Sequence, residues 1–271
     1  MKSVIPLTRN NLLVVVPMFN EQDSIGQVLD NLLKENYQLV VVDDGSKDNS
    51  RDIALSKGVN VLSLPFNLGV GAALRAGFKF AERHDYQAVI QVDADGQHNC
   101  LQISELINAA NESDAHLVIG SRFQHPEESM SVPVIRRSVM RILAALASRA
   151  TKVKITDATS GFRLIRQPLL SEFAQEFPSY YLGDTYEALV SAGRAGYTVR
   201  EIPAVIVERT HGESSASRLQ SVKFIFKCVV VAGLGLQFRI NSLDTKSLLS
   251  SSASGVINRQ KTVPNDCSVQ N

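Results

Sequence analysis

The sequence predicts an α/β protein with a doubly wound, mostly parallel β-sheet, and two observations support this fold class. First, short aliphatic runs recur along the first half of the 271-residue chain, and stretches with helical periodicity separate them. Second, these runs lack polar alternation, which is typical of strands that are buried on both faces of a parallel sheet. In sheets of this kind, ligands bind outside the carboxyl ends of the strands.

The elements of the first half follow from this pattern in chain order. The predicted strands are Leu12–Val16, Leu39–Val42, Val59–Leu62, Ala88–Val92 and Leu117–Ile119. The predicted helices between them are Ser24–Lys34, Ser50–Lys57, Gly71–Arg83 and Leu101–Asn111. Polar residues follow the first, second, fourth and fifth strands directly, so we expect a ligand site at the carboxyl edge of the sheet.

The second half is less regular than the first. We expect a helix over Val134–Arg149 and then a loop that begins at Asp157 and enters a short strand at Arg163. Further predicted elements are a helix over Thr185–Ala195 and extended chain over Thr198–Ile202 and Ala204–Val207. Together these elements predict one globular domain over residues 1–218.

Two further segments follow this domain. Residues 219–241 are apolar and carry Lys223, Lys227 and Arg239, which predicts an amphipathic helix that associates with a membrane surface. The alternative is a helix that packs on the domain or docks on a small membrane-protein partner. No run approaches the ~20 apolar residues of a membrane-spanning helix. Residues 242–271 are rich in Ser and Asn, which predicts a flexible tail.

The charge balance argues against nucleic acid as a partner. The chain has 28 Lys and Arg against 27 Asp and Glu, whereas a generic nucleic-acid binder needs a basic surplus to neutralise phosphates. The cysteines Cys100, Cys228 and Cys267 form no CxxC pair and no zinc-binding spacing. We therefore expect a reducing, cytoplasmic compartment.

Asp93 and Asp95 follow the fourth predicted strand with one residue between them. Two carboxylates this close repel each other, and a hard divalent cation would relieve the repulsion, with ligand phosphates completing its coordination. Gln97 offers a further oxygen ligand. A solvated acidic turn is an equally good interpretation of this short motif on its own.

Other polar residues allow both a ligand-binding and a structural interpretation. Asp44 could accept hydrogen bonds from a ribose, although Asp-Gly-Ser also favours a turn. The glycine-containing loop from Asn67, ahead of a helix with Arg75, could approach a phosphate or simply form a tight turn. Arg122 and Arg209 could clamp a phosphate or form surface ion pairs.

Four more side chains have open roles. His98 and His211 could bind a metal ion, but a hydrogen-bonded loop histidine is the more frequent case. Asp184 and Glu187 lie at a predicted helix start, where a carboxylate is favourable as a cap. Each of these signals is weak by itself.

In combination the motifs are specific. In chain order, PxFNE, VVDDGS, NxGxGAAxRxG, DADGQH, GSR, SGFRL and RTHGESS resemble the family 2 glycosyltransferases, which have the GT-A fold. The chain is most similar to the dolichyl- and polyprenyl-phosphate mannose or glucose synthase group. The resemblance covers about Leu12 to Ser215 and implies a GT-A glycosyltransferase domain with the nucleotide-sugar site at the strand carboxyl ends.

The resemblance implies roles for residues in most of these motifs. The donor-binding residues would be Pro17, Phe19, Glu21, Val42, Asp44, Asn67, Arg75 and Ala94. Asp93, Asp95 and Gln97 would hold Mg²⁺ or Mn²⁺, and Arg122 and Arg209 would clamp a phosphate. The implied reaction moves a sugar, with inversion, from a UDP- or GDP-sugar to a polyprenyl phosphate. Such an enzyme would be cytoplasmic and peripheral at the inner face of the membrane.

The acceptor stays open at this point. Ser215 stands where the compared synthases usually carry Lys, and residues 182–187 also differ from their pattern. A hydroxyl of a growing glycan is the alternative acceptor, and it would need a general base, for which Asp184 and Glu187 are candidates. A nucleotidyltransferase and a nucleotide-sugar-binding module without turnover are the alternatives from other functional classes.

Overall fold

The computed structural model describes residues 5–123, 134–178 and 184–205, which fall within a compact unit spanning Met1–Asn241. The predicted 219–241 helix and 242–271 tail lie outside the described residues. The strands are β1 (Leu12–Met18), β2 (Leu39–Asp43), β3 (Asn60–Ser63), β4 (Ala88–Gln91), β5 (Leu117–Ser121), β6 (Arg163–Arg166) and β7 (Val199–Pro203). The helices are α1 (Ile25–Lys34), α2 (Ser50–Ser56), α3 (Val70–Arg83), the short 3-10 helix η1 (Cys100–Gln102), α4 (Ile103–Ser113), α5 (Val134–Thr151), α6 (Leu169–Gln175) and α7 (Asp184–Arg194).

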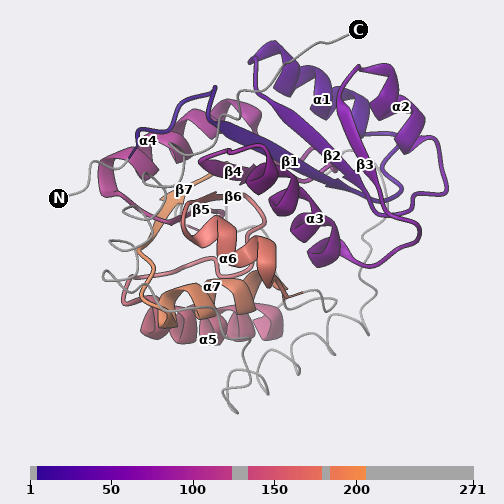
Figure 1. The fold of residues 1–271 in the computed structure, drawn as a ribbon. Coiled ribbons are helices and arrows are strands. Elements are labelled where there is room, and N and C mark those ends of the chain that lie inside the picture. Colours follow the sequence, from indigo (N-terminus) through magenta and orange to yellow (C-terminus); the bar gives the residue numbers. More distant parts are fainter. Residues whose placement is uncertain (1–4, 124–133, 179–183, 206–271) are drawn as a thin grey trace, which may run out of the picture. The chain divides into compact units, whose positions relative to one another are not determined.

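The described strands form a seven-stranded sheet in the order β3-β2-β1-β4-β6-β5-β7 (Figure 1). Every neighbouring pair is parallel except the two pairs that β6 makes, with β4 and with β5. The predicted fold class, a doubly wound and mostly parallel sheet, is therefore confirmed. The five strands predicted in the first half are all present.

The central strands are buried as their composition predicts. All residues of β1, β2, β4 and β5 are buried, because helices cover both faces of the sheet. β3 is different, since all four of its residues are partly or fully exposed. The expectation of burial on both faces was wrong for this strand because β3 is at the edge of the sheet.

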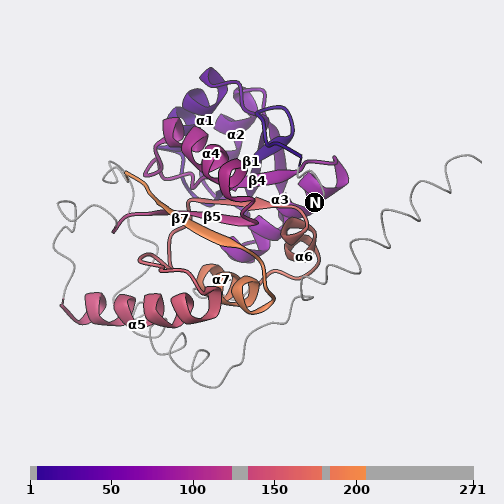
Figure 2. The same cartoon turned by 90° about the vertical axis from the view of Figure 1, so that its left-hand side faces the viewer.

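Two layers of helices enclose the sheet (Figure 2). The helices α1 and α4 pack on one face, where Leu29 and Leu106 join a core cluster with β1 and β4. The helices α3, α6 and α7 lie on the other face, and α5 lies beside α7 (Figure 2). Helix α3 approaches β1 very closely at Gly77, because a Cβ atom there would collide with Val15.

The second half contains the parts that sequence pattern alone did not place. β6 runs antiparallel between β4 and β5, with Gln91 opposite Arg163 and Ala88 opposite Arg166. Helix α6 was not predicted at all. Because β6 is antiparallel, the loop that precedes it reaches the carboxyl edge of the parallel strands.

Within the part of the chain that the structure describes, no helix combines the length and apolarity needed to cross a bilayer.

Candidate functional site

The site lies at the carboxyl edge of the sheet, where the ends of β4 and β5 meet the loop that enters β6. Asp93 follows β4 and Arg122 follows β5, while Asp157 and Gly161 belong to the loop before β6. Parallel strands bring their carboxyl ends to one edge, and β6 contributes its amino end there because it is antiparallel.

Asp93 is held by residues on both sides of it in the chain. Its Oδ1 accepts a hydrogen bond from Gln91 Nε2 at 3.1 Å, and its backbone N–H donates to His98 Nδ1 at 3.0 Å. The Nε2 atom of His98 lies 3.6 Å from Asp93 Oδ2. The Asp93 side chain is still 37% exposed, so part of its carboxylate remains open to a ligand.

Asp95 and Gln97 belong to the tight turn that follows. The backbone N–H of Gln97 donates to Asp95 Oδ1 at 3.1 Å, and Gly96 supplies the left-handed conformation that the turn requires, with φ +78°. Ala94 is buried beneath the turn. Among residues 5–123, 134–178 and 184–205, no group of three or more His, Cys, Asp or Glu side chains is arranged to hold a metal ion.

The donor set nonetheless fits one particular class of metal site. Mg²⁺ and similar hard cations are commonly held by one or two carboxylates together with the phosphates of a substrate. Asp93 and Asp95 supply two such carboxylates, and Gln97 adds an amide oxygen. The fit is therefore to a cation that binds together with a phosphate-bearing ligand.

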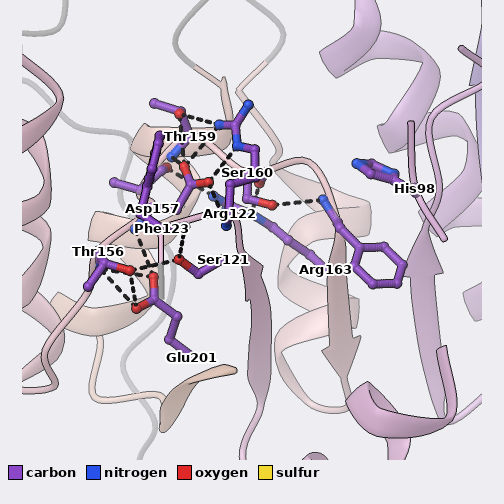
Figure 3. Close-up of polar contacts among 12 residues, drawn as sticks. His98, Ser121, Arg122, Phe123, Thr156, Asp157, Thr159, Ser160, Arg163 and Glu201 are labelled. Atoms are coloured by element: carbon purple, nitrogen blue, oxygen red, sulfur yellow. Dashed lines mark hydrogen bonds and ion pairs between the residues drawn. The ribbon is translucent and has the colours of Figure 1, made fainter. Parts of the chain in front are cut away.

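At the end of β5, Arg122 forms an ion pair with Asp157, whose side chain is fully buried while that of Arg122 is partly exposed (Figure 3). Its Nε donates to Asp157 Oδ2 at 2.7 Å and its Nη2 donates to Asp157 Oδ1 at 3.0 Å. Burial raises the pKa of the Asp157 carboxyl, but the hydrogen bonds and charge of Arg122 outweigh this effect and hold that pKa below its usual value. The pair therefore stays ionised and orients the guanidinium.

The Arg122 guanidinium also lies within electrostatic range of Asp93. Burial lowers the pKa of Arg122, whereas the partner Asp157 and, more weakly, Asp93 raise it, with a net increase. Within the described part of the chain, Nη1 of Arg122 makes no hydrogen bond, and the side chain is 34% exposed. Arg122 thus retains one donor group for a ligand.

Arg163 is the fully buried cation at the centre of the site (Figure 3). Its three guanidinium nitrogens donate to the backbone carbonyl oxygens of Ser160 at 2.7 Å, Thr185 at 2.7 Å and Ala158 at 3.0 Å. Burial lowers the pKa of Arg163 to about 10, so the side chain is charged at neutral pH. The carboxylates that oppose this decrease are Asp157, Asp184, Asp93 and Glu201.

Asp184 begins α7, close to the predicted helix start, and it is buried. Its Oδ1 accepts hydrogen bonds from the backbone N–H of Thr185 at 2.7 Å and from the Thr185 hydroxyl at 3.1 Å. Burial raises the pKa of the Asp184 carboxyl, the charge of Arg163 opposes the increase, and Asp93 adds to it. Glu187 is half-buried in the first turn of the same helix.

Asp44 stabilises the loop before α3 through two hydrogen bonds. Its Oδ1 accepts the backbone N–H of Leu68 at 2.7 Å, and its Oδ2 accepts that of Gly69 at 2.8 Å. Burial raises the pKa of Asp44, and these two hydrogen bonds oppose the increase. Asp43 forms the expected turn, since its Oδ1 accepts the N–H of Ser46 at 3.0 Å. A ribose contact by Asp44 stays a prediction.

The other predicted donor-binding residues differ in exposure. Pro17 and Val42 lie opposite each other on β1 and β2 and are buried in the sheet. Phe19 and Asn67 are exposed at the same edge, and Glu21 is half-buried. No contact in the structure tests their roles.

Arg75 is engaged elsewhere. Its Nε donates to the carbonyl oxygen of Ala174 at 3.5 Å, and its Nη2 donates to that of Gln175. Both acceptors are at the carboxyl end of α6, where a cation is favourable. Arg75 therefore ties α3 to α6, and contact with a donor phosphate would compete with these bonds.

Sequence reasoning gave no role to Asp157, Gly161 or Arg163. The SGFRL motif contains Gly161 and Arg163, but their contacts depend on the antiparallel placement of β6, which the pattern did not indicate. Arg209 and His211 lie outside the described residues, so their predicted roles stay predictions.

With this geometry established, comparison with known proteins identifies the family. The family model described as glycosyl transferase family 2 matches residues 13–173. The undecaprenyl-phosphate mannosyltransferase of Micrococcus luteus is 30% identical, covering 76% of this chain and 87% of that protein. The UDP-N-acetylglucosamine–dolichyl-phosphate N-acetylglucosaminyltransferase of Methanococcus voltae is 27% identical, covering 79% of this chain and 91% of that protein.

Among solved structures, the glucosyl-3-phosphoglycerate synthase of Mycobacterium tuberculosis, crystallised with Mn²⁺ and UDP-glucose, has a similar fold. It superimposes with a TM-score of 0.59 at 21% identity, covering 83% of this chain and 78% of that chain. The sheet with its single inserted antiparallel strand is thus GT-A-like. The family match covers more than half of the chain and includes the motifs at the carboxyl edge, and the protein is therefore a glycosyltransferase that belongs to family 2.

Proposed function

We propose that this enzyme transfers a sugar, with inversion, from a UDP- or GDP-sugar to a polyprenyl phosphate. Two relatives at 27–30% identity are named for transfer to undecaprenyl and dolichyl phosphates, and they use different sugars. The similar solved structure was crystallised with UDP-glucose and Mn²⁺. These likenesses support a nucleotide-sugar donor and a lipid-phosphate acceptor.

One observation carries the proposal. Asp93 follows β4 and Arg122 follows β5 at the same edge of the sheet, within electrostatic range of each other, and each side chain is partly exposed. A carboxylate that suits a cation beside a guanidinium that suits a phosphate matches a reaction between a diphosphate donor and a phosphate acceptor.

The donor end of the site would hold a divalent cation. Asp93, Asp95 and Gln97 would bind Mg²⁺ or Mn²⁺, because their side-chain oxygens are the kind of ligand that these hard cations prefer. When bound, the cation would neutralise the negative charge that develops on the departing nucleoside diphosphate. Asp157 keeps Arg122 oriented, and Arg163 keeps the surrounding loops in place through its three carbonyl contacts.

The transfer itself is a direct displacement. An oxygen of the acceptor forms a bond to the anomeric carbon as the bond from that carbon to the diphosphate oxygen breaks. A phosphate acceptor is already an anion at neutral pH, so it needs no general base. Arg122 would hold it through Nη1 while its remaining donors stay on Asp157 and Thr159.

A second acceptor class has an observation in its favour. Burial raises the pKa of Asp184, which lies within electrostatic range of Asp93. A carboxylate with a raised pKa is a better proton acceptor, and a sugar hydroxyl would need one. The alternative function is therefore transfer to a hydroxyl of a growing glycan, with Asp184 or Glu187 as base.

A lipid acceptor would bring the enzyme to the membrane surface. The segment proposed to make this contact is the apolar stretch over residues 219–241, whose Lys223, Lys227 and Arg239 suit anionic headgroups. Flotation with anionic vesicles should carry the full chain upward, and a chain truncated after residue 218 should float less.

The acceptor is tested with a panel of UDP- and GDP-sugars, a short-chain polyprenyl phosphate and an oligosaccharide, with products read by mass spectrometry. A glycosyl phospholipid supports the proposal, and it should form equally well with Asp184→Asn. A product on a glycan hydroxyl that disappears in Asp184→Asn supports the alternative. Binding of the sugar nucleotide without any turnover contradicts both.

A further inference from the structure

Two residues, His98 and Gly161, enclose the Asp93 carboxylate without belonging to the proposed ligand set. We infer that they are positioning residues, which together hold this carboxylate in the one orientation that a bound cation requires. The inference rests on the proposed function, because that function gives Asp93 a cation to bind. Neither residue would touch the substrate or the cation.

Gly161 faces Asp93 because of the strand register. Gln91 lies opposite Arg163 in the antiparallel pair of β4 and β6, and continuing that register places residue 161 opposite residue 93. Side chains opposite each other in antiparallel strands have Cβ atoms about 5 Å apart. A Cβ atom at Gly161 would lie 2.8 Å from Asp93 Oδ2 and 3.3 Å from its Oδ1. The Cβ atom of any other residue at position 161 would therefore press against the Asp93 carboxylate.

His98 contacts Asp93 from a second direction. Its Nδ1 accepts the backbone N–H of Asp93 at 3.0 Å, so in the neutral ring the proton is on Nε2. The Nε2 atom lies 3.6 Å from Asp93 Oδ2, beyond hydrogen-bond distance, so the ring packs beside this oxygen without donating to it. The His98 side chain is only 6% exposed, and its ring packs 5.0 Å from the ring of Phe162, which fixes its orientation.

The result is a carboxylate supported on one side and open on the other. Gln91 Nε2 donates a hydrogen bond to Oδ1, the His98 ring packs beside Oδ2, and the backbone at Gly161 lies close to both oxygens. The exposed remainder of Asp93 is left for a ligand. Groups that orient metal ligands in this way typically contribute 10- to 100-fold to metal affinity.

The test of Gly161 is the variant Gly161→Ala, with Gly26→Ala as the matched control. A Cβ at Gly26 in α1 would make an ordinary contact, 3.5 Å from Ile53. Binding of Mn²⁺ in the presence of UDP or GDP is measured from the loss of the free-ion signal in electron paramagnetic resonance. We expect Gly161→Ala to weaken Mn²⁺ binding by about tenfold or more. The control should bind as the wild type does.

Two further measurements separate positioning from general damage. The affinity for the nucleotide without Mn²⁺ and the thermal midpoint should change little in Gly161→Ala. At His98, His98→Asn keeps an oxygen that can accept the Asp93 N–H, whereas His98→Leu has a side chain of similar size without an acceptor. We expect His98→Asn to bind Mn²⁺ several-fold more tightly than His98→Leu.

The outcomes distinguish this inference from the function on which it rests. If the wild type binds Mn²⁺ and Gly161→Ala binds it equally well with the same spectrum, the positioning role is wrong and the proposed function stands. If Gly26→Ala weakens binding as much as Gly161→Ala, the role is also wrong. If the wild type takes up no Mn²⁺ with either nucleotide, both the inference and the proposed metal site are overturned. The His98 pair decides the matter should Gly161→Ala fail to fold.

Discussion

Replacing Asp157 with asparagine removes the charge that orients Arg122 and keeps the size of the side chain. The carboxylate accepts two hydrogen bonds from the guanidinium, at 2.7 and 3.0 Å. Hydrogen bonds to charged groups contribute about 1.5–3 kcal/mol each, which gives about 3–6 kcal/mol for the two. Because Arg122 is 34% exposed and water can replace part of this interaction, we expect a loss at the lower end, about 3 kcal/mol.

The assay is urea denaturation of Asp157→Asn beside Asp30→Asn as a control. Lys57 and Asp30 form an ion pair at 2.7 Å, but the Asp30 side chain is 42% exposed whereas that of Asp157 is fully buried, so the loss of the Lys57–Asp30 pair should cost under about 1 kcal/mol. If the two variants lose the same stability, the reasoning about burial is refuted. With Arg122 released, Asp157→Asn should also raise the KM for a phosphate acceptor.

Three more predictions follow from the structure. Asp95→Ala should abolish metal-dependent transfer while the circular dichroism spectrum stays unchanged, and full release of UDP or GDP by this variant would contradict the metal assignment. Gly77→Ala should destabilise the protein. The added methyl group would overpack against Val15 at a cost of about 1–3 kcal/mol, which exceeds the gain of up to about 1 kcal/mol from replacing a glycine within a helix. An unchanged unfolding midpoint would contradict this prediction. Since the folded-state pKa of Asp157 lies below its usual value, its stabilising effect is present above about pH 4 and is lost as the pH falls further. The stability difference between wild type and Asp157→Asn should therefore shrink in acid, and a constant difference down to pH 2 would argue against an ionised pair.

Much of the first half could be predicted because its signals are local. Aliphatic runs such as Leu39–Val42 form buried strands, and polar residues that follow them, such as Asp93, lie at the carboxyl edge. The acidic pair Asp93 and Asp95 could be placed at this edge without a structure. The exposure of β3 could not be predicted, because an edge strand and a central strand can share the same composition.

The second half resisted prediction because its contacts are distant in sequence. Arg163 is buried only because β6 inserts between β4 and β5 in the antiparallel direction, and a four-residue strand carries no mark of that direction. Asp157 becomes the partner of Arg122 through the same insertion, across 35 positions of sequence. An isolated arginine in a loop therefore gave no indication of the carboxylate that orients it.

The central claim is that the acidic pair after β4 binds a divalent cation together with the diphosphate of the donor. The most direct test is a crystal structure with Mn²⁺ and UDP or GDP, in which anomalous scattering locates the metal. The account predicts a peak bound by the carboxylates of Asp93 and Asp95 and by diphosphate oxygens. A nucleotide bound with both carboxylates turned away from it, and no metal between them, would contradict the account.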